Sequence, residues 1–220
     1  MKWTGLILLV AIGLGGCGSD NDATAGARLI QSSAKGILAK RGKSATAAPA
    51  VTREALAGFS TPMIMVEIPS LGLLTFIVPI AQNGDVETWS TVDDKTISFR
   101  QGSMVATRGF GPDIMQATGP SLAQLASGNG SHDRVYYYLD GADQVQRFEY
   151  RCTMANTGNE TVTVVSLQHS TRHVTESCTG KTGAFVNEYW FESNDFLRKS
   201  KQLLINAWGS ITLQRVIDNG

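Results

Sequence analysis

Cys17 has the surroundings of a cysteine that carries lipid. A positively charged start, Met1-Lys2, precedes an apolar run from Trp3 to Leu14, and Gly15-Gly16 stands directly before the cysteine. A charged start, an apolar run and small residues are the parts of an export signal, and the cysteine completes the lipobox pattern of bacterial lipoproteins. The apolar run is shorter than the ~20 residues of a transmembrane helix. We therefore expect cleavage before Cys17 and acylation of that residue. The alternative is an ordinary cleaved signal with a chance cysteine.

Cys152 and Cys178 form an even pair once Cys17 is acylated. In an oxidising compartment such a pair is expected to form a disulfide, which would stabilise the fold by about 3 kcal/mol in the chain-entropy account. The alternative is a metal site with His169 and His173. Because these histidines lie in a Thr- and Val-rich stretch without a carboxylate cluster, we predict the disulfide, and we predict no metal or cofactor.

Two patterns could support hydrolysis. Ser131-His132-Asp133 holds the residue types of a serine hydrolase triad, but neighbours on a glycine-rich loop cannot adopt the triad geometry. Glu188, two residues before Trp190, is the carboxylate considered as the acid of a glycan-cleaving enzyme, which needs a second carboxylate facing it. We predict a solvated loop at 131–133 and no enzyme activity. Glycan cleavage through Glu188 remains a third hypothesis.

Aromatic side chains concentrate at Tyr136-Tyr137-Tyr138 and Tyr189-Trp190-Phe191. On strands, alternation sends the middle residue of each triplet to the face opposite its neighbours. Tyr137 and Trp190 are therefore candidates for contact with sugar rings. Packing against neighbouring strands is the alternative for both residues.

The composition indicates an ordinary globular protein. The chain has 220 residues, of which 42% are hydrophobic, and its 19 Lys and Arg balance its 19 Asp and Glu. This neutral balance, without a basic stripe, gives no reason to expect a nucleic-acid partner.

The elements that must position these residues are short strands. We expect a signal peptide at 1–16, a lipidated tether at 17–51 and one β-rich domain at 52–220, with a short helix after Thr52 as its N-cap and a helical turn near 122–125. Runs of β-branched and aromatic residues separated by turn signals predict strands at 63–68, 73–80, 86–91, 96–99, 104–107, 134–139, 145–153, 161–169, 172–178, 184–192, 197–204 and 211–217. This pattern predicts an all-β fold, an antiparallel meander that forms a sandwich or an open barrel.

Parts of the chain resemble the YjbF family of lipoproteins, which includes GfcB proteins encoded with capsule genes. The resemblance lies in Gln82–Thr91 with its tryptophan, in Thr96–Phe99, in the segment ending Ala106-Thr107-Arg108-Gly109, and in Asn187–Phe191 followed by Arg198–Gln202 and a final strand. It implies a largely β outer-membrane lipoprotein beside the export machinery for exopolysaccharide or capsule. It brings no enzymatic activity and no catalytic residues.

The leading hypothesis is a non-enzymatic accessory lipoprotein of polysaccharide secretion. Acylated Cys17 would hold it in the lipid bilayer on the periplasmic face of the outer membrane, where Gly18 stands in place of the aspartate that signals inner-membrane retention. Its domain would bind the polysaccharide or another export protein. The alternative is a carrier of lipids or lipoproteins with an apolar barrel interior, lined by 63–66 and 73–78.

Overall fold

A computed structural model describes residues 51–140, 142, 144–205 and 208–218. The predicted signal peptide, Cys17 and most of the tether lie outside these residues. The described part contains a helix α2 (Arg53–Leu56), a 3₁₀ turn η1 (Pro69–Leu71) and a helix α3 (Leu122–Ser127). Its strands are β1 (Met63–Ile68), β2 (Leu73–Asn83), β3 (Val86–Ser90), β4 (Thr96–Arg100), β5 (Ser103–Arg108), β6 (Ile114–Ala117), β7 (Ser131–Leu139), β8 (Val145–Val164), β9 (Leu167–Gly180), β10 (Gly183–Phe191), β11 (Leu197–Ile205) and β12 (Gly209–Ile217).

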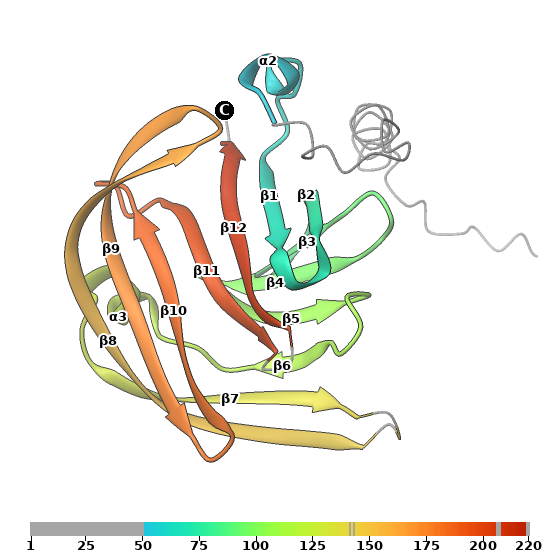
Figure 1. The fold of residues 1–220 in the computed structure, drawn as a ribbon, viewed down its shortest axis with the longest axis vertical. Helices are drawn as coiled ribbons and strands as arrows, with labels where there is room; N and C mark the ends of the chain where they lie inside the picture. Colours follow the sequence, from blue (N-terminus) through green and yellow to red (C-terminus); the bar gives the residue numbers. More distant parts are fainter. Residues whose placement is uncertain (1–50, 141, 143, 206–207, 219–220) are drawn as a thin grey trace, which may run out of the picture.

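The strands form one antiparallel sheet that curls into a nearly closed barrel (Figure 1). Strands that follow one another in sequence pair, except for β5 and β6, which are the two ends of the sheet order. In addition, β1 pairs with β12 and thereby joins the two ends of the domain. The predicted all-β antiparallel meander is confirmed, and of the two predicted arrangements the barrel is the one formed.

The first and last strands in the sheet order, β5 and β6, meet through side chains. The Arg108 guanidinium donates to the carbonyl of Ile114 (2.9 Å), and the amide of Ile114 donates to Thr107 Oγ1 (3.0 Å). Asp113 accepts from Thr107 Oγ1 (2.9 Å) and from the amide of Phe110 (3.2 Å). These contacts satisfy backbone groups that an open sheet edge would expose.

The two short helices begin at polar caps that are readable in the sequence. Thr52 Oγ1 accepts from the amide of Ala55 (3.3 Å) at the start of α2, as predicted. Ser121 and Gln124 form a reciprocal capping box at the start of α3, and Gly128 ends it with φ +61°. The helical turn predicted near 122–125 is confirmed.

The hairpin of β8 and β9 differs from the prediction. The break predicted between strands 145–153 and 161–169 is absent, and β8 instead carries a bulge where Gly158 has φ +108° and its amide donates to Asn156 Oδ1 (3.0 Å). The chain reverses at Val165 and Ser166, which have φ +44° and +67°. Because two-residue turns with positive φ favour Asn and Gly, these residues give no turn signal, and the predicted break between 169 and 172 is absent from β9.

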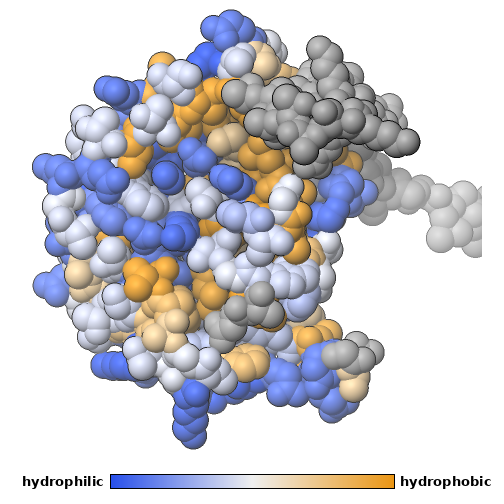
Figure 2. All heavy atoms as spheres, viewed as in Figure 1, coloured by the Kyte–Doolittle hydropathy of each residue, from blue (hydrophilic) through white to orange (hydrophobic). Residues whose placement is uncertain are grey.

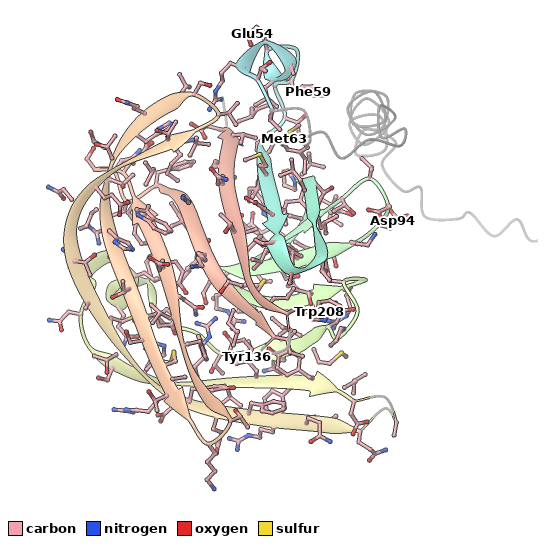
Figure 3. The ribbon with its side chains drawn as sticks, viewed as in Figure 1. Glu54, Phe59, Met63, Asp94, Tyr136 and Trp208 are labelled. Carbon is pink, nitrogen blue, oxygen red and sulfur yellow. A yellow bond between two sulfur atoms is a disulfide. The ribbon has the colours of Figure 1, made fainter. Side chains whose placement is uncertain are left out.

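The described residues form three apolar cores, the smallest of which gathers Leu125, Met154, Val174, Tyr189 and Phe191. The largest core fills the barrel interior, and Tyr136 lies within it (Figure 3). The second core includes Leu56, Met63, Val164 and Trp190, with Phe59 packed against it. Figure 2 shows hydrophobic side chains gathered below α2 on the face in view.

Arg53 joins α2 to two distant segments beside this second core. Its guanidinium donates to the carbonyls of Val164 (2.7 Å), Val165 (2.8 Å) and Val216 (2.7 Å). The helix, the tip of the β8–β9 hairpin and the end of β12 are thereby held together at one side of the barrel.

Trp208, on the β11–β12 turn, packs against Gly111 of the β5–β6 loop. Gly111 has φ +107°, and any side chain there would collide with the indole. Ser70 Oγ donates to the carbonyl of Trp208 (2.6 Å), and Tyr138 Oη donates to the carbonyl of Leu204 (2.9 Å). These contacts close the barrel where the β11–β12 turn lies.

Candidate functional site

A cavity of about 270 Å³ opens between the β4–β5 turn and the β10–β11 turn. Buried side chains from five strands line it: Ile64, Phe99, Phe191, Ser200 and Leu213. Less buried and exposed side chains surround them: Glu87, Leu122, Phe196, Lys199 and Arg215. Cavities with an apolar floor and a few converging polar groups are the usual form of small-molecule sites. We refer to this cavity as the barrel-end pocket.

Arg215 contributes a cation to the barrel-end pocket that is held by aromatic rings. Its guanidinium carbon lies 4.5 Å from the ring centre of Trp89 and 5.5 Å from that of Phe196. Burial lowers the pKa of Arg215, and the negative charge of Glu87 acts in the opposite direction. The Arg215 side chain donates no hydrogen bond and forms no ion pair with any residue that the structure describes. Its donors are therefore available in the pocket.

The charge of Arg198, the other arginine in this pocket, is neutralised by two carboxylates. It donates to Glu192 (2.8 Å) and makes a bidentate pair with Asp218 (2.8 Å for both bonds). It also donates to the backbone carbonyl of Arg215 (2.9 Å). Its side chain is 6% exposed, so Arg198 holds β11 to the end of β12 and is not free to bind an anion.

A polar groove adjoins the barrel-end pocket and shares Phe191 and Asp195 with it. The groove has a volume of about 470 Å³ and runs between the extended β8–β9 hairpin and the β10–β11 turn. Arg172 donates to Asp195 (2.7 Å) there. Carboxylate, amide and hydroxyl groups line the groove: Asn159, Glu160, Thr161, Ser170, Thr171, Glu192 and Ser193.

Inside the barrel, Arg134 and Glu176 form an ion pair that is fully shielded from solvent. Arg134 Nη1 lies 2.9 and 3.0 Å from the two carboxylate oxygens of Glu176, and both side chains are 0% exposed. Strand alternation places Arg134 on the same face of β7 as Tyr136 and Tyr138. The barrel interior is therefore polar at this point, although the surrounding core is apolar.

Every oxygen of Glu176 has further donors. Oε1 accepts from His132 Nε2 (2.9 Å), and Oε2 accepts from Asn187 Nδ2 (2.8 Å) and Tyr189 Oη (2.9 Å). Arg134 also donates to Tyr136 Oη (2.6 Å). A buried ion pair is tolerated only when such bonds replace the lost hydration.

Gln202 forms a second buried contact set, next to the barrel-end pocket. Its amide donates to the carbonyl of Gly102 (2.9 Å) and to Ser200 Oγ (3.0 Å), while its oxygen accepts from the amide of Met104 (2.8 Å). Gln202 therefore fixes the β4–β5 turn and the floor of the pocket against β11.

The buried Arg134–Glu176 pair predicts that the folded protein loses stability in acid. Burial would raise the pKa of Glu176, but the charge of Arg134 and bonds from His132 and Asn187 outweigh it and lower the pKa from 4.5 to about 2. Because the folded pKa lies below the unfolded one, this stabilisation is complete above about pH 5 and is lost as the pH falls toward 2. We expect a loss of about 3 kcal/mol, measured by urea unfolding between pH 7 and pH 2. Glu176→Gln should remove this part of the pH dependence, and an unchanged pH profile in that variant would contradict the assignment.

Comparison with known proteins identifies the family of this chain. The family described as group 4 capsule polysaccharide lipoprotein GfcB, YjbF, matches residues 28–216. The chain belongs to the YjbF family. A solved structure, that of the hypothetical lipoprotein YmcC from Escherichia coli (K12), has a TM-score of 0.71 and 13% sequence identity over 92% of this chain and 98% of that chain. At this identity the likeness supports the fold alone. No curated protein matches the chain, and no helix among the described residues is long and apolar enough to cross a membrane.

In this YjbF-family chain, Cys152 and Cys178 form a disulfide between directly opposed residues of β8 and β9. Within the described residues, the grouping of metal-ligating side chains is His132, Cys152 and Glu176, with ligand atoms within 4.8 Å of one another. The disulfide occupies the Cys152 sulfur, and Arg134 pairs with Glu176. This set is therefore committed to the interior contacts, and His169 and His173 are not part of it.

The two aromatic candidates for glycan contact lie in different surroundings. Trp190 is 6% exposed; His173 stacks on its ring at 4.6 Å, and Lys199 Nζ lies 4.8 Å from its centre. Its indole donates to Glu160 (2.8 Å). Tyr137 is partly exposed on β7 and accepts from Arg147 Nε (3.2 Å). A sugar could reach Tyr137 directly, whereas Trp190 would first have to lose its neighbours.

The residues weighed for hydrolysis do not assemble into a catalytic set. The loop predicted at 131–133 is wrong, because these residues begin β7 and pair with β8. Alternation sends His132 to Glu176 inside the barrel and leaves Ser131 and Asp133 exposed outside. Glu188 lies 3.2 Å from His173 Nε2 and 3.5 Å from Lys201 Nζ, in a charged cluster on the outer face.

Sequence reasoning missed the residues that define the barrel-end pocket. Arg215 and Phe196 come from a strand and a turn that meet only when β11 and β12 pair and β3 curls beside them. The Arg134–Glu176 pair could have been predicted from the sequence, because each charged residue alternates with buried apolar residues in its strand. A charge on the apolar face of a strand indicates an interior partner.

Proposed function

We propose that this protein is a non-enzymatic accessory lipoprotein of capsule or exopolysaccharide production that binds the polysaccharide at the barrel-end pocket. Acylated Cys17 would tether it to the periplasmic face of the outer membrane. Membership of the YjbF family supports the connection with capsule. The observation that carries the binding proposal is the pocket itself, in which an apolar floor meets the Arg215 guanidinium and the oxygens of Glu87 and Ser200.

The chemistry of the pocket suits a sugar. A sugar ring presents C–H faces that pack on aromatic and aliphatic surfaces, and hydroxyls that both donate and accept hydrogen bonds. Phe99 and Leu213 provide the apolar surface, and Glu87 and Ser200 provide oxygens. The adjoining polar groove, which shares Phe191 and Asp195, could hold the next sugars of a chain.

The interior does not favour the alternative of a lipid carrier. The runs 63–66 and 73–78, expected to line an apolar cavity, instead contribute side chains to two of the packed cores. An acyl chain needs a continuous apolar cavity, and the barrel interior beneath the pocket is crossed by the Arg134–Glu176 pair.

The test is surface polysaccharide in a deletion strain, complemented separately with the intact gene and with Cys17→Ser. We expect polysaccharide to fall in the deletion strain and to be restored by the lipidated form alone. Equal protein levels, measured by immunoblot, are the control. Unchanged polysaccharide in the deletion strain would overturn the accessory role, and full rescue by Cys17→Ser would overturn the tether.

A further inference from the structure

We infer that the barrel-end pocket recognises a carboxylate-bearing sugar residue, with the Arg215 guanidinium as the group that reads the carboxylate. This inference rests on the proposed function and names the class of sugar that the site selects.

The charge of Arg215 is available to a ligand. Its guanidinium is held against Trp89 and Phe196 and has no ion-pair partner among the described residues. The negative charges of Glu87 and Asp218 act on Arg215 without forming an ion pair with it. A partly buried cation that lacks such a pair costs free energy, which an anionic ligand would recover. Among the positively charged side chains of the pocket, Arg198 is neutralised by Glu192 and Asp218. The Lys199 ammonium lies over the ring of Trp190, which is not a lining residue of the pocket. Arg215 is therefore the cation left for a ligand.

The shape of the Arg215 guanidinium matches that of a carboxylate. A guanidinium presents a planar fork of donors that matches the two oxygens of a carboxylate. The aromatic contacts of Arg215 hold its plane, so less side-chain freedom is lost when the pair forms. The site is thus suited to a carboxylate more than to a neutral hydroxyl.

Glu87 is the acidic neighbour of Arg215 in the pocket. Glu87 lines the same pocket, and its carboxylate accepts from the indole of Trp89 (3.2 Å). A ligand that is anionic throughout would be repelled by Glu87, whereas a sugar acid carries hydroxyl donors beside its carboxylate. One sugar ring could therefore give its hydroxyls to Glu87 and its carboxylate to Arg215.

The size of the pocket agrees with this occupant. Small-molecule sites span about 300–1,000 Å³, and a cavity of about 270 Å³ is close to the lower limit. This volume suits a single acidic sugar as the anchor, with neighbouring sugars along the polar groove.

The test is calorimetric binding of oligosaccharides prepared from the strain's own surface polysaccharide, before and after chemical reduction of their carboxyl groups. The protein is the full chain in mild detergent. We expect binding of the native oligosaccharides and at least a tenfold weaker affinity after carboxyl reduction. Because charged hydrogen bonds are the strongest class, Arg215→Gln should weaken the native ligand by about the same factor.

Arg151→Gln is the matched control, since Arg151 is an exposed arginine on β8 that pairs with Asp133 outside the pocket. It should leave the affinity unchanged. Arg215→Lys, which keeps the charge without the fork, should fall between the wild type and Arg215→Gln. Thermal unfolding of each variant confirms that the folded protein is being compared.

The outcomes separate this inference from the proposed function. Equal binding of native and carboxyl-reduced oligosaccharides would overturn recognition of the acid and leave glycan binding intact. Native binding that Arg215→Gln does not weaken would overturn the role of Arg215. Binding of neither form would overturn glycan recognition itself, while the polysaccharide level of the deletion strain would still decide the accessory role.

Discussion

Arg134→Met is expected to lower the free energy of unfolding by about 3–5 kcal/mol, because it leaves the Glu176 carboxylate buried without its countercharge. Both side chains are fully buried, and the two carboxylate oxygens lie 2.9 and 3.0 Å from Arg134 Nη1. The remaining donors to Glu176 are hydrogen-bonding groups that cannot replace a full positive charge. Urea unfolding at pH 7, followed by circular dichroism, measures the loss.

Arg151→Met is the matched control for Arg134→Met. Arg151 pairs with Asp133 at 3.0 Å, but its side chain is 65% exposed, and exposed pairs contribute about 0–1 kcal/mol. The double variant Arg134→Met with Glu176→Gln should be more stable than Arg134→Met alone, because the buried charge is then removed. Equal losses for the two arginine variants would contradict the role given to the interior pair.

Removal of the disulfide is expected to have the second largest effect. Cys152→Ala with Cys178→Ala should lower the free energy of unfolding by about 2–5 kcal/mol, since the unfolded chain regains the freedom of the loop that the bond closes. The two cysteines are 26 residues apart in sequence and almost fully buried. Urea unfolding of the oxidised wild type and the double variant gives the difference.

The control for the disulfide is the neighbouring opposed pair on the outer face of the same two strands. Thr153→Ala with Ser177→Ala changes two side chains at the same depth along β8 and β9 without altering the crosslink. Its effect should stay below about 1 kcal/mol, as is usual for surface substitutions. If reduction of the wild type by dithiothreitol left its stability unchanged, the stabilising role of the disulfide would be wrong.

Most of the strands could be predicted from the sequence because they carry a local signal, but the short strand β6 was not predicted. Alternation and turns that contain Gly, Asn or Asp mark β1 to β5 and β10 to β12, and the caps at Thr52 and Ser121 mark the helices. The β8–β9 hairpin could not be predicted, since its turn at Val165 and Ser166 depends on the second core and on Arg53 rather than on residue type. A local sequence pattern gives no signal where contacts between distant residues determine the conformation.

The candidate site was less predictable than the fold. Trp190 is conspicuous in the sequence, yet His173 and Lys199 cover its ring, because strands β9 and β11 flank it in the sheet. Arg215 is inconspicuous in the sequence, yet the closure of the barrel brings it to Trp89 and Phe196. Sequence indicates the face of a strand on which a residue lies, but barrel closure decides which distant residues share a pocket.

The pairing of β1 with β12 sets the order in which the molecule can fold. Every other strand pair joins neighbours in the chain, whereas Val66 must find Leu213 across almost the whole domain. Such distant pairing is slow because the loop must close before its contacts form. A chain whose last strand has not yet emerged from the ribosome therefore cannot complete the barrel. Because Ile64 of β1 and Leu213 of β12 both line the barrel-end pocket, the pocket would form only after the whole domain has been synthesised.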